Sequence, residues 1–136
     1  MNSIRFVPTV VHGVLDYVGG IGLMASPFIF GFVSLGGIAV ALPIVLGVGL
    51  VTYSLLTDYE LGVPSWRVVP VWLHLSMDFS AAGLLAVAPF VFGYADEGLK
   101  VWLPQVVSGL AVMVLALVTK TDSQSAVTVS PAKATG

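Results

Sequence analysis

The sequence predicts an all-α membrane protein, a four-transmembrane-helix bundle built from two tandem two-helix repeats with a parallel pseudo-twofold relation. Three observations lead to this prediction. The chain has 57% hydrophobic residues, 9% charged residues and a mean hydropathy of +1.03, whereas soluble domains carry about 25% charged residues. The apolar residues form long uncharged stretches, and one residue pattern occurs twice along the chain. Lipid is therefore expected to cover most of the surface.

The positions of the charged residues delimit the spans. Between Arg5 and Asp58 the only charged residue is Asp16, and between Arg67 and Asp96 the only one is Asp78. One membrane crossing takes about 20 residues, so each stretch exceeds one crossing, and the first, residues 6–57, is long enough for two. The stretches are apolar all round, which favours helices over the alternating strands of a barrel. We expect spans at about 8–25, 37–57, 70–88 and 101–119.

The two halves of the chain match when one is shifted by 62 residues. The matched pairs are Arg5 with Arg67, Pro8 with Pro70, His12 with His74, Asp16 with Asp78, Gly47 with Gly109 and Thr57 with Thr119. We therefore predict one membrane domain over residues 1–120, with a first repeat at 3–58, a second at 65–120 and a polar C-terminal tail at 121–136. Because each repeat has an even number of crossings, both enter the membrane from the same side.

The basic residues predict the orientation. Arg5, Arg67, Lys120 and Lys133 fall on one side of the predicted membrane and Lys100 on the other. By the positive-inside rule, both termini are expected to be cytoplasmic, in a chain integral to the cytoplasmic (inner) membrane. Arg5 and Arg67 are thus candidate anchors or contacts for lipid headgroups.

Composition also excludes several classes of function. A net charge of −2 without a basic cluster gives no electrostatic footprint for nucleic acid. Without cysteine the chain has no disulfide and no thiolate nucleophile. No serine or cysteine nucleophile motif is present, and we do not expect an enzyme.

Each repeat is expected to close its first helix with a proline followed by aromatic residues. The two segments are Ser26-Pro27-Phe28, followed by Phe30-Gly31, and Ala88-Pro89-Phe90, followed by Phe92-Gly93. Proline is predicted to end the helix and the aromatic rings to lie at the headgroup level. With two helices per unit, the pattern resembles the SPW-repeat family of small bacterial integral membrane proteins over about residues 5–119. Phe replaces the family's Trp in both copies, and Ala88 replaces its Ser in the second. The resemblance implies the fold and the membrane location.

Other residues are predicted to serve the membrane or the packing of helices. Gly47 and Gly109 are candidates for close helix contacts. An interfacial position is expected for the aromatic residues Tyr59, Trp66, Trp72, Tyr94 and Trp102.

The candidate functional residues come from the pattern Arg-x2-Pro-x3-His-x3-Asp, which ends in His12 and Asp16 and again in His74 and Asp78. A spacing of four places each His and Asp on one helix face. The aspartates lie about 12 Å along their helices from the prolines. A charged Asp near the bilayer centre costs about 2.5–3.5 kcal/mol, so it must face the bundle interior, be neutral or have a partner.

Four roles stay open for these residues. In a structural role, each Asp bonds its own His or a hydroxyl such as those of Ser76, Ser80 or Tyr17. As ligands, His12 and His74 would bind a metal or a tetrapyrrole with the aspartates orienting them, and a closed zinc site would need both carboxylates. A proton or ion path and catalysis with His as base are the others. The sequence does not decide whether the two imidazoles converge.

Taken together, the sequence predicts a small non-catalytic integral membrane protein. With no soluble domain and no nucleotide site, we expect an accessory or stabilising subunit of a larger membrane assembly, whose partners are lipid and either other membrane subunits or copies of itself. The alternative function is binding of a metal or tetrapyrrole, or relay of protons or ions, through the duplicated His-x3-Asp motif.

Overall fold

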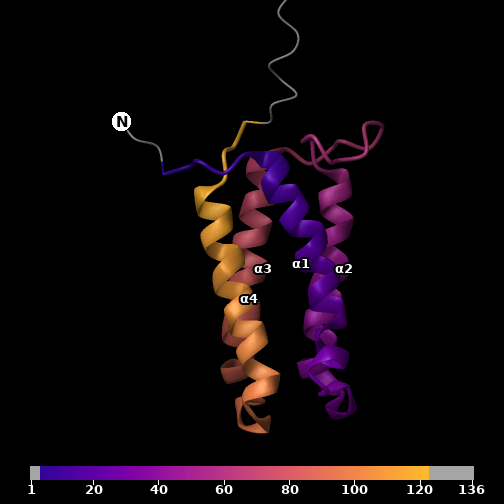
Figure 1. Cartoon of the computed structure of the whole chain (residues 1–136), viewed down its shortest axis with the longest axis vertical. Coiled ribbons are helices and arrows are strands. Elements are labelled where there is room, and N and C mark those ends of the chain that lie inside the picture. Colours follow the sequence, from indigo (N-terminus) through magenta and orange to yellow (C-terminus); the bar gives the residue numbers. More distant parts are fainter. Residues whose placement is uncertain (1–3, 123–136) are drawn as a thin grey trace, which may run out of the picture.

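The computed structural model describes residues 4–122, so the predicted tail lies outside the described residues from position 123 onward. The elements in chain order are α1 (Thr9–Ile29), the 3-10 helix η1 (Val33–Leu35), α2 (Gly37–Leu56), α3 (Val71–Val91), the 3-10 helix η2 (Ala95–Glu97) and α4 (Leu99–Val118). The four long helices stand side by side, with the start of α1, the α2–α3 connection and the end of α4 at one end of the bundle (Figure 1). Within residues 4–122 β pairing is limited to isolated bridges, and the all-α prediction is confirmed.

The two halves have elements of the same order and length. Helices of 21 and 20 residues flank a 3-10 helix of 3 residues in each half. Three of the four long helices, α2, α3 and α4, are long and apolar enough to cross a membrane. The exception is α1, which is as long as α3 but contains four glycines where α3 contains one.

The helices do not end at their prolines, and that prediction was wrong. α1 continues past Pro27 to Ile29, and α3 continues past Pro89 to Val91. Proline removes the N–H that would bond the carbonyl four residues earlier, which in α1 is the carbonyl of Leu23. The Ser26 hydroxyl donates to that carbonyl at 2.8 Å and replaces the lost bond.

Glycine, rather than proline, marks where the chain leaves each helix. Gly31 and Gly93 have φ angles of 70° and 74°, in the left-handed region where a side chain is disfavoured. Just beyond them, the N–H groups of Phe32 and Tyr94 donate to the carbonyls of Pro27 and Pro89 at 2.8 and 2.9 Å. The tight reversal into the second helix of each half thus depends on the Gly after the Pro-Phe-x-Phe sequence.

Helices α1 and α2 form one hairpin, and α3 and α4 form the other. At the other end of the bundle, the extended segment before each hairpin pairs with the last residues of the opposite hairpin. The N–H groups of Phe6 and Val7 donate to the Val118 carbonyl at 2.8 and 3.0 Å, and that of Lys120 donates to the Val7 carbonyl at 2.9 Å. The same three bonds recur in the other half, from Val68, Val69 and Asp58, at 2.9, 3.0 and 2.8 Å. Carbonyls at the ends of α2 and α4, which have no partner within their helices, are thereby satisfied by the opposite hairpin.

Two of the five aromatic residues predicted to lie at the membrane interface are buried inside the bundle. Trp66 and Trp72 are exposed, but Tyr59 and Tyr94 are 2% and 6% exposed. The Tyr94 hydroxyl donates to Gln105 Oε1 at 2.8 Å, and Tyr59 packs against Gly13. Both tyrosines lie inside the bundle because each finds a polar partner or a glycine-lined space there.

The close-packing prediction for two glycines is confirmed. A Cβ on Gly47 would lie 2.5 Å from the Gly20 carbonyl oxygen of α1, and one on Gly109 would lie 2.5 Å from the Ala82 carbonyl oxygen of α3. Backbone lines both contacts, so no side chain can move aside. The two hairpins therefore need glycine where their helices cross.

We predict that Gly109→Ala lowers the free energy of unfolding by about 1–3 kcal/mol, because the added methyl group forces α3 and α4 apart. The matched control is Gly49→Ala, at a helical glycine of α2 with open space around it. There, alanine is neutral or stabilises by up to about 1 kcal/mol. Thermal unfolding of the two variants in detergent tests this, and equal effects would contradict the packing account.

Candidate functional site

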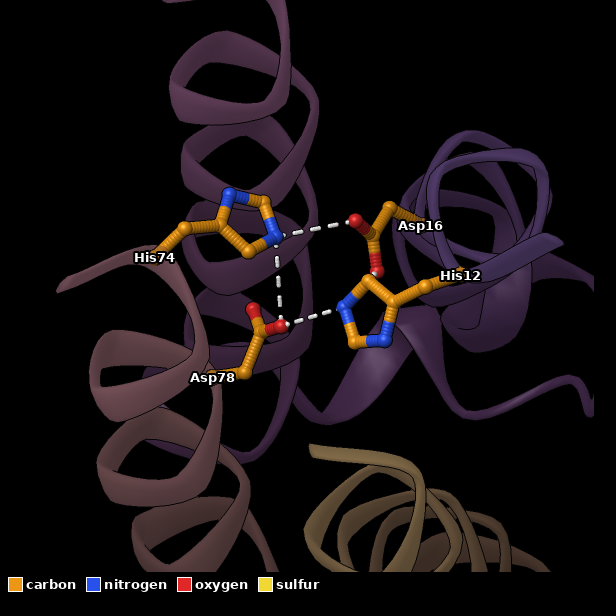
Figure 2. Close-up of side chains that lie close together, drawn as sticks. All are labelled: His12, Asp16, His74 and Asp78. Carbon is orange, nitrogen blue, oxygen red and sulfur yellow. Dashed lines mark hydrogen bonds and ion pairs between the residues drawn. The ribbon is translucent and has the colours of Figure 1, made fainter. Parts of the chain in front are cut away.

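The four predicted residues meet at one place inside the bundle. His12 and Asp16 come from α1, and His74 and Asp78 come from α3 (Figure 2). One ligand atom from each lies within 4.8 Å of all the others, and all four residues are at most 3% exposed. We call these four residues the His–Asp cluster.

The shortest contacts in the cluster run between the two hairpins. His12 Nε2 lies 2.8 Å from Asp78 Oδ2, and His74 Nε2 lies 2.9 Å from Asp16 Oδ2. The contacts along each helix, from His12 to Asp16 and from His74 to Asp78, are both 3.2 Å. The cluster is therefore a ring in which imidazole and carboxylate alternate, and each histidine bonds the aspartate of the other hairpin more closely than its own.

One threonine contacts the second ring nitrogen, Nδ1, of each histidine. His12 Nδ1 lies 2.7 Å from Thr119 Oγ1, and His74 Nδ1 lies 2.7 Å from Thr57 Oγ1. Each threonine hydroxyl already donates its hydrogen to a backbone carbonyl, at 2.6 Å for Thr119 and 2.7 Å for Thr57. Since a hydroxyl has one hydrogen, it must accept from the imidazole. Both Nδ1 atoms therefore carry a proton, and both Nε2 atoms face the carboxylates.

Helix α2 supplies the remaining partners of the aspartates. The Tyr53 hydroxyl makes a short hydrogen bond to Asp78 Oδ1, and the Ser54 hydroxyl donates to Asp16 Oδ2 at 3.3 Å. Their counterparts in the second half, 62 residues on, are Leu115 and Ala116, which have no hydroxyl. The cluster is thus symmetric in its histidines, aspartates and threonines but not in its outer partners.

The hydroxyls that the sequence offered as partners of the aspartates bond elsewhere. Ser76 and Ser80 donate to carbonyls of their own helix at 2.8 and 2.9 Å, and the Tyr17 hydroxyl donates to the Leu61 carbonyl at 3.0 Å. Helix-surface serines commonly bond the carbonyl four residues back. Sequence reasoning missed Thr57, Thr119, Tyr53 and Ser54, although the match of Thr57 with Thr119 between repeats was a usable signal.

A loop residue covers the cluster at the end where the termini lie. Tyr59, from the connection between α2 and α3, places its ring 5.7 Å from that of His74. Burial raises the pKa of this tyrosine, so the phenol is neutral. With both histidines and both threonines, Tyr59 lines a cavity of about 10 Å³, which is the space of roughly one water molecule.

The two candidate anchor arginines lie at this same end. Arg5 Nη1 donates to the carbonyls of Thr119 at 2.7 Å and Ala116 at 3.3 Å, at the end of α4. Arg67 donates to the Gly62 carbonyl and lies 3.9 Å from Asp58. Both guanidinium groups therefore stabilise the ends of helices and loops around the His–Asp cluster, and neither reaches into it.

Comparison with protein families gives a match for most of the chain. A family model described as SPW repeat domain matches residues 10–119, a range that contains the whole His–Asp cluster and both threonines. No curated protein and no solved structure matches. The resemblance predicted from the Pro-Phe segments is confirmed.

We predict that Asp78→Ala lowers the free energy of unfolding by about 3–5 kcal/mol, because it removes the closest carboxylate of the buried His12 and leaves the Tyr53 hydroxyl without its acceptor. Asp58→Ala is the control, since the Asp58 side chain is 60% exposed and its loss is worth at most about 1 kcal/mol. Denaturant unfolding in micelles measures both. A similar small loss in the two variants would show that the crossed contacts do not hold the hairpins together.

Proposed function

The chain belongs to the SPW repeat domain family, and from this premise we propose that it is a small, non-catalytic integral membrane protein of the bacterial inner membrane. In this proposal it has four spans in two repeats related by a pseudo-twofold axis along the membrane normal, and it serves as an accessory or stabilising subunit of a larger assembly.

Packing supports α1 as the fourth span. Its glycines lie where neighbours approach closely, since a Cβ on Gly20 would lie 2.7 Å from the Val51 side chain and 3.0 Å from the Gly47 carbonyl oxygen of α2. The helix is therefore held along α2, which is apolar enough to cross the membrane. Its outward face carries the exposed apolar residues Val10, Val11, Val14, Leu15, Val18, Ile21, Phe28 and Ile29. A face of that kind is suited to lipid.

One observation carries the accessory role, namely that polar groups are satisfied inside the chain while the outer faces are apolar. Among the described residues, Tyr59 Oη is the one buried side-chain polar atom without a hydrogen-bond partner. By contrast, large apolar side chains are exposed on all four helices, among them Val18, Val45, Val87 and Val114. Such faces contact lipid or the helices of another membrane protein through van der Waals packing.

The proposed orientation predicts which loops react with a reagent added outside the cell. Because the chain has no cysteine, Ser65→Cys and Asp96→Cys each introduce a single thiol at an exposed position. With an impermeant maleimide, we expect Asp96→Cys to be labelled in intact cells and Ser65→Cys only after lysis. The reverse result would invert the topology, and labelling of both in intact cells would contradict four spans.

The accessory role predicts contact with another protein on part of the surface. We would place a photo-crosslinking amino acid at Val18, Val45, Val87 or Val114, one on each helix, and irradiate native membranes. We expect one defined partner to be crosslinked in high yield from one or two of these positions and not from the others, which serve as matched controls. Lipid adducts alone at all four positions, with a lone chain on a native gel, would refute the accessory role.

A further inference from the structure

We propose that the His–Asp cluster binds one divalent transition-metal ion of the zinc class, with His12 Nε2, His74 Nε2 and one oxygen each of Asp16 and Asp78 as its four ligands. The inference goes beyond the accessory role and does not depend on it. It rests on the spacing of the four atoms, the charge of the cluster and the groups behind the histidines.

The spacing suits a four-coordinate ion. Contacts of 2.8, 3.2 and 2.9 Å link His12 Nε2 to Asp78 Oδ2, Asp78 Oδ2 to His74 Nε2, and His74 Nε2 to Asp16 Oδ2. The fourth contact, at 3.2 Å, joins His12 Nε2 to the other oxygen of Asp16, Oδ1. One ligand atom from each residue lies within 4.8 Å of the other three, and ligands on opposite sides of an ion with bonds of about 2.1 Å lie about 4.2 Å apart. Zinc with four protein ligands is almost always tetrahedral, and the side chains of the cluster would rearrange to that geometry on binding. Without thiolates, this ligand set suits zinc and similar borderline ions.

The charge of the cluster suits exchange of protons for a divalent ion. A net charge is costly at membrane depth, so under this proposal the empty cluster of two carboxylates and two imidazoles protonated at Nδ1 takes up two further protons. An ion of charge +2 that enters releases these two protons to solvent, and the net charge of the site stays zero. This balance matters because an uncompensated charge is costly at membrane depth. The full exchange is one M²⁺ bound for two H⁺ released.

The groups behind the histidines are those that metal-bound imidazoles require. A ligating His typically donates its other ring N–H to a fixed acceptor, which sets the tautomer and the ring orientation. Thr119 and Thr57 accept from the two Nδ1–H groups at 2.7 Å each. The threonines are themselves fixed by their bonds to the Leu115 and Tyr53 carbonyls. Both Nε2 lone pairs are thereby directed at the centre of the ring once the two further protons leave.

The surroundings favour a bare ion over a larger group. The cavity beside the cluster, lined by both histidines, both threonines and Tyr59 but by neither aspartate, has a volume of about 10 Å³, and a macrocycle does not fit there. An apolar groove of about 340 Å³ between α1 and α4 also reaches Asp16. The cluster thus adjoins both the end of the bundle covered by Tyr59 and the lateral groove.

The test is titration of the full chain with Zn²⁺ and Co²⁺, purified without a polyhistidine tag and stripped with a chelator. We expect one ion per chain, about two protons released per ion in calorimetry across buffers of different ionisation enthalpy, and a tetrahedral Co²⁺ visible spectrum. The His12→Ala/His74→Ala variant should lose all three signals. Absence of stoichiometric binding to the wild type, or equal binding by the double variant, would overturn the proposal.

A second pair of variants keeps the test valid if the double variant does not fold. Thr119→Val retains all four ligands but removes the acceptor behind His12, and we expect Zn²⁺ affinity to fall about 10- to 100-fold. Thr52→Val is the matched control, because the Thr52 hydroxyl donates to the Val48 carbonyl at 2.7 Å on an exposed face. Unchanged affinity in Thr119→Val, or an equal fall in Thr52→Val, would count against the site. The crosslinking experiment tests the accessory role and the titration tests the metal site, so either proposal can fail without the other.

Discussion

The crossed pairing of each histidine with the aspartate of the opposite hairpin is the constraint on which the rest of the structure depends. A buried carboxylate in a span needs a partner, and the closer partners, at 2.8 and 2.9 Å, are on the other hairpin. The two hairpins must therefore meet in one register, with α1 beside α3 at the depth of the cluster. The backbone hydrogen bonds from Val7 and Val69 to the ends of α4 and α2 fix the same register at the end of the bundle where α1 begins.

Much of this arrangement was predictable because it depends on local spacing. Hydropathy and the repeat gave the helices, and the i, i+4 spacing gave the face that His12 and Asp16 share. Whether the histidines meet was not predictable, since that depends on how two hairpins cross. Tyr53 and Ser54 were missed for a related reason: the second half has Leu115 and Ala116 in their places, so a search for residues common to both halves passes over them. Pro27 was misjudged because its effect depends on the neighbouring Ser26 hydroxyl.

The two aspartates are similar in sequence context but differ in their surroundings. Asp78 accepts a short hydrogen bond from Tyr53, whereas Asp16 accepts a longer one from Ser54. Both donors come from α2, so one helix completes the polar environment of both carboxylates, whereas Thr119, just after α4, contacts His12. The side of the cluster toward α2 is thus the more polar one. The electrostatic environment of an ion or proton in the cluster therefore differs between Asp16 and Asp78.

The crossed contacts also have a consequence for the evolutionary origin of the two similar halves. A single hairpin of this kind has one histidine, one aspartate and one terminal threonine, and two copies about a twofold axis would build the same ring between separate molecules. An ancestral homodimer joined end to end by the 57–70 connection would keep the crossed His–Asp and His–Thr contacts of the present chain. In a homodimer the two halves are identical by necessity. Gene fusion removes that necessity, and residues such as Tyr53 opposite Leu115 are differences that only the fused chain can acquire.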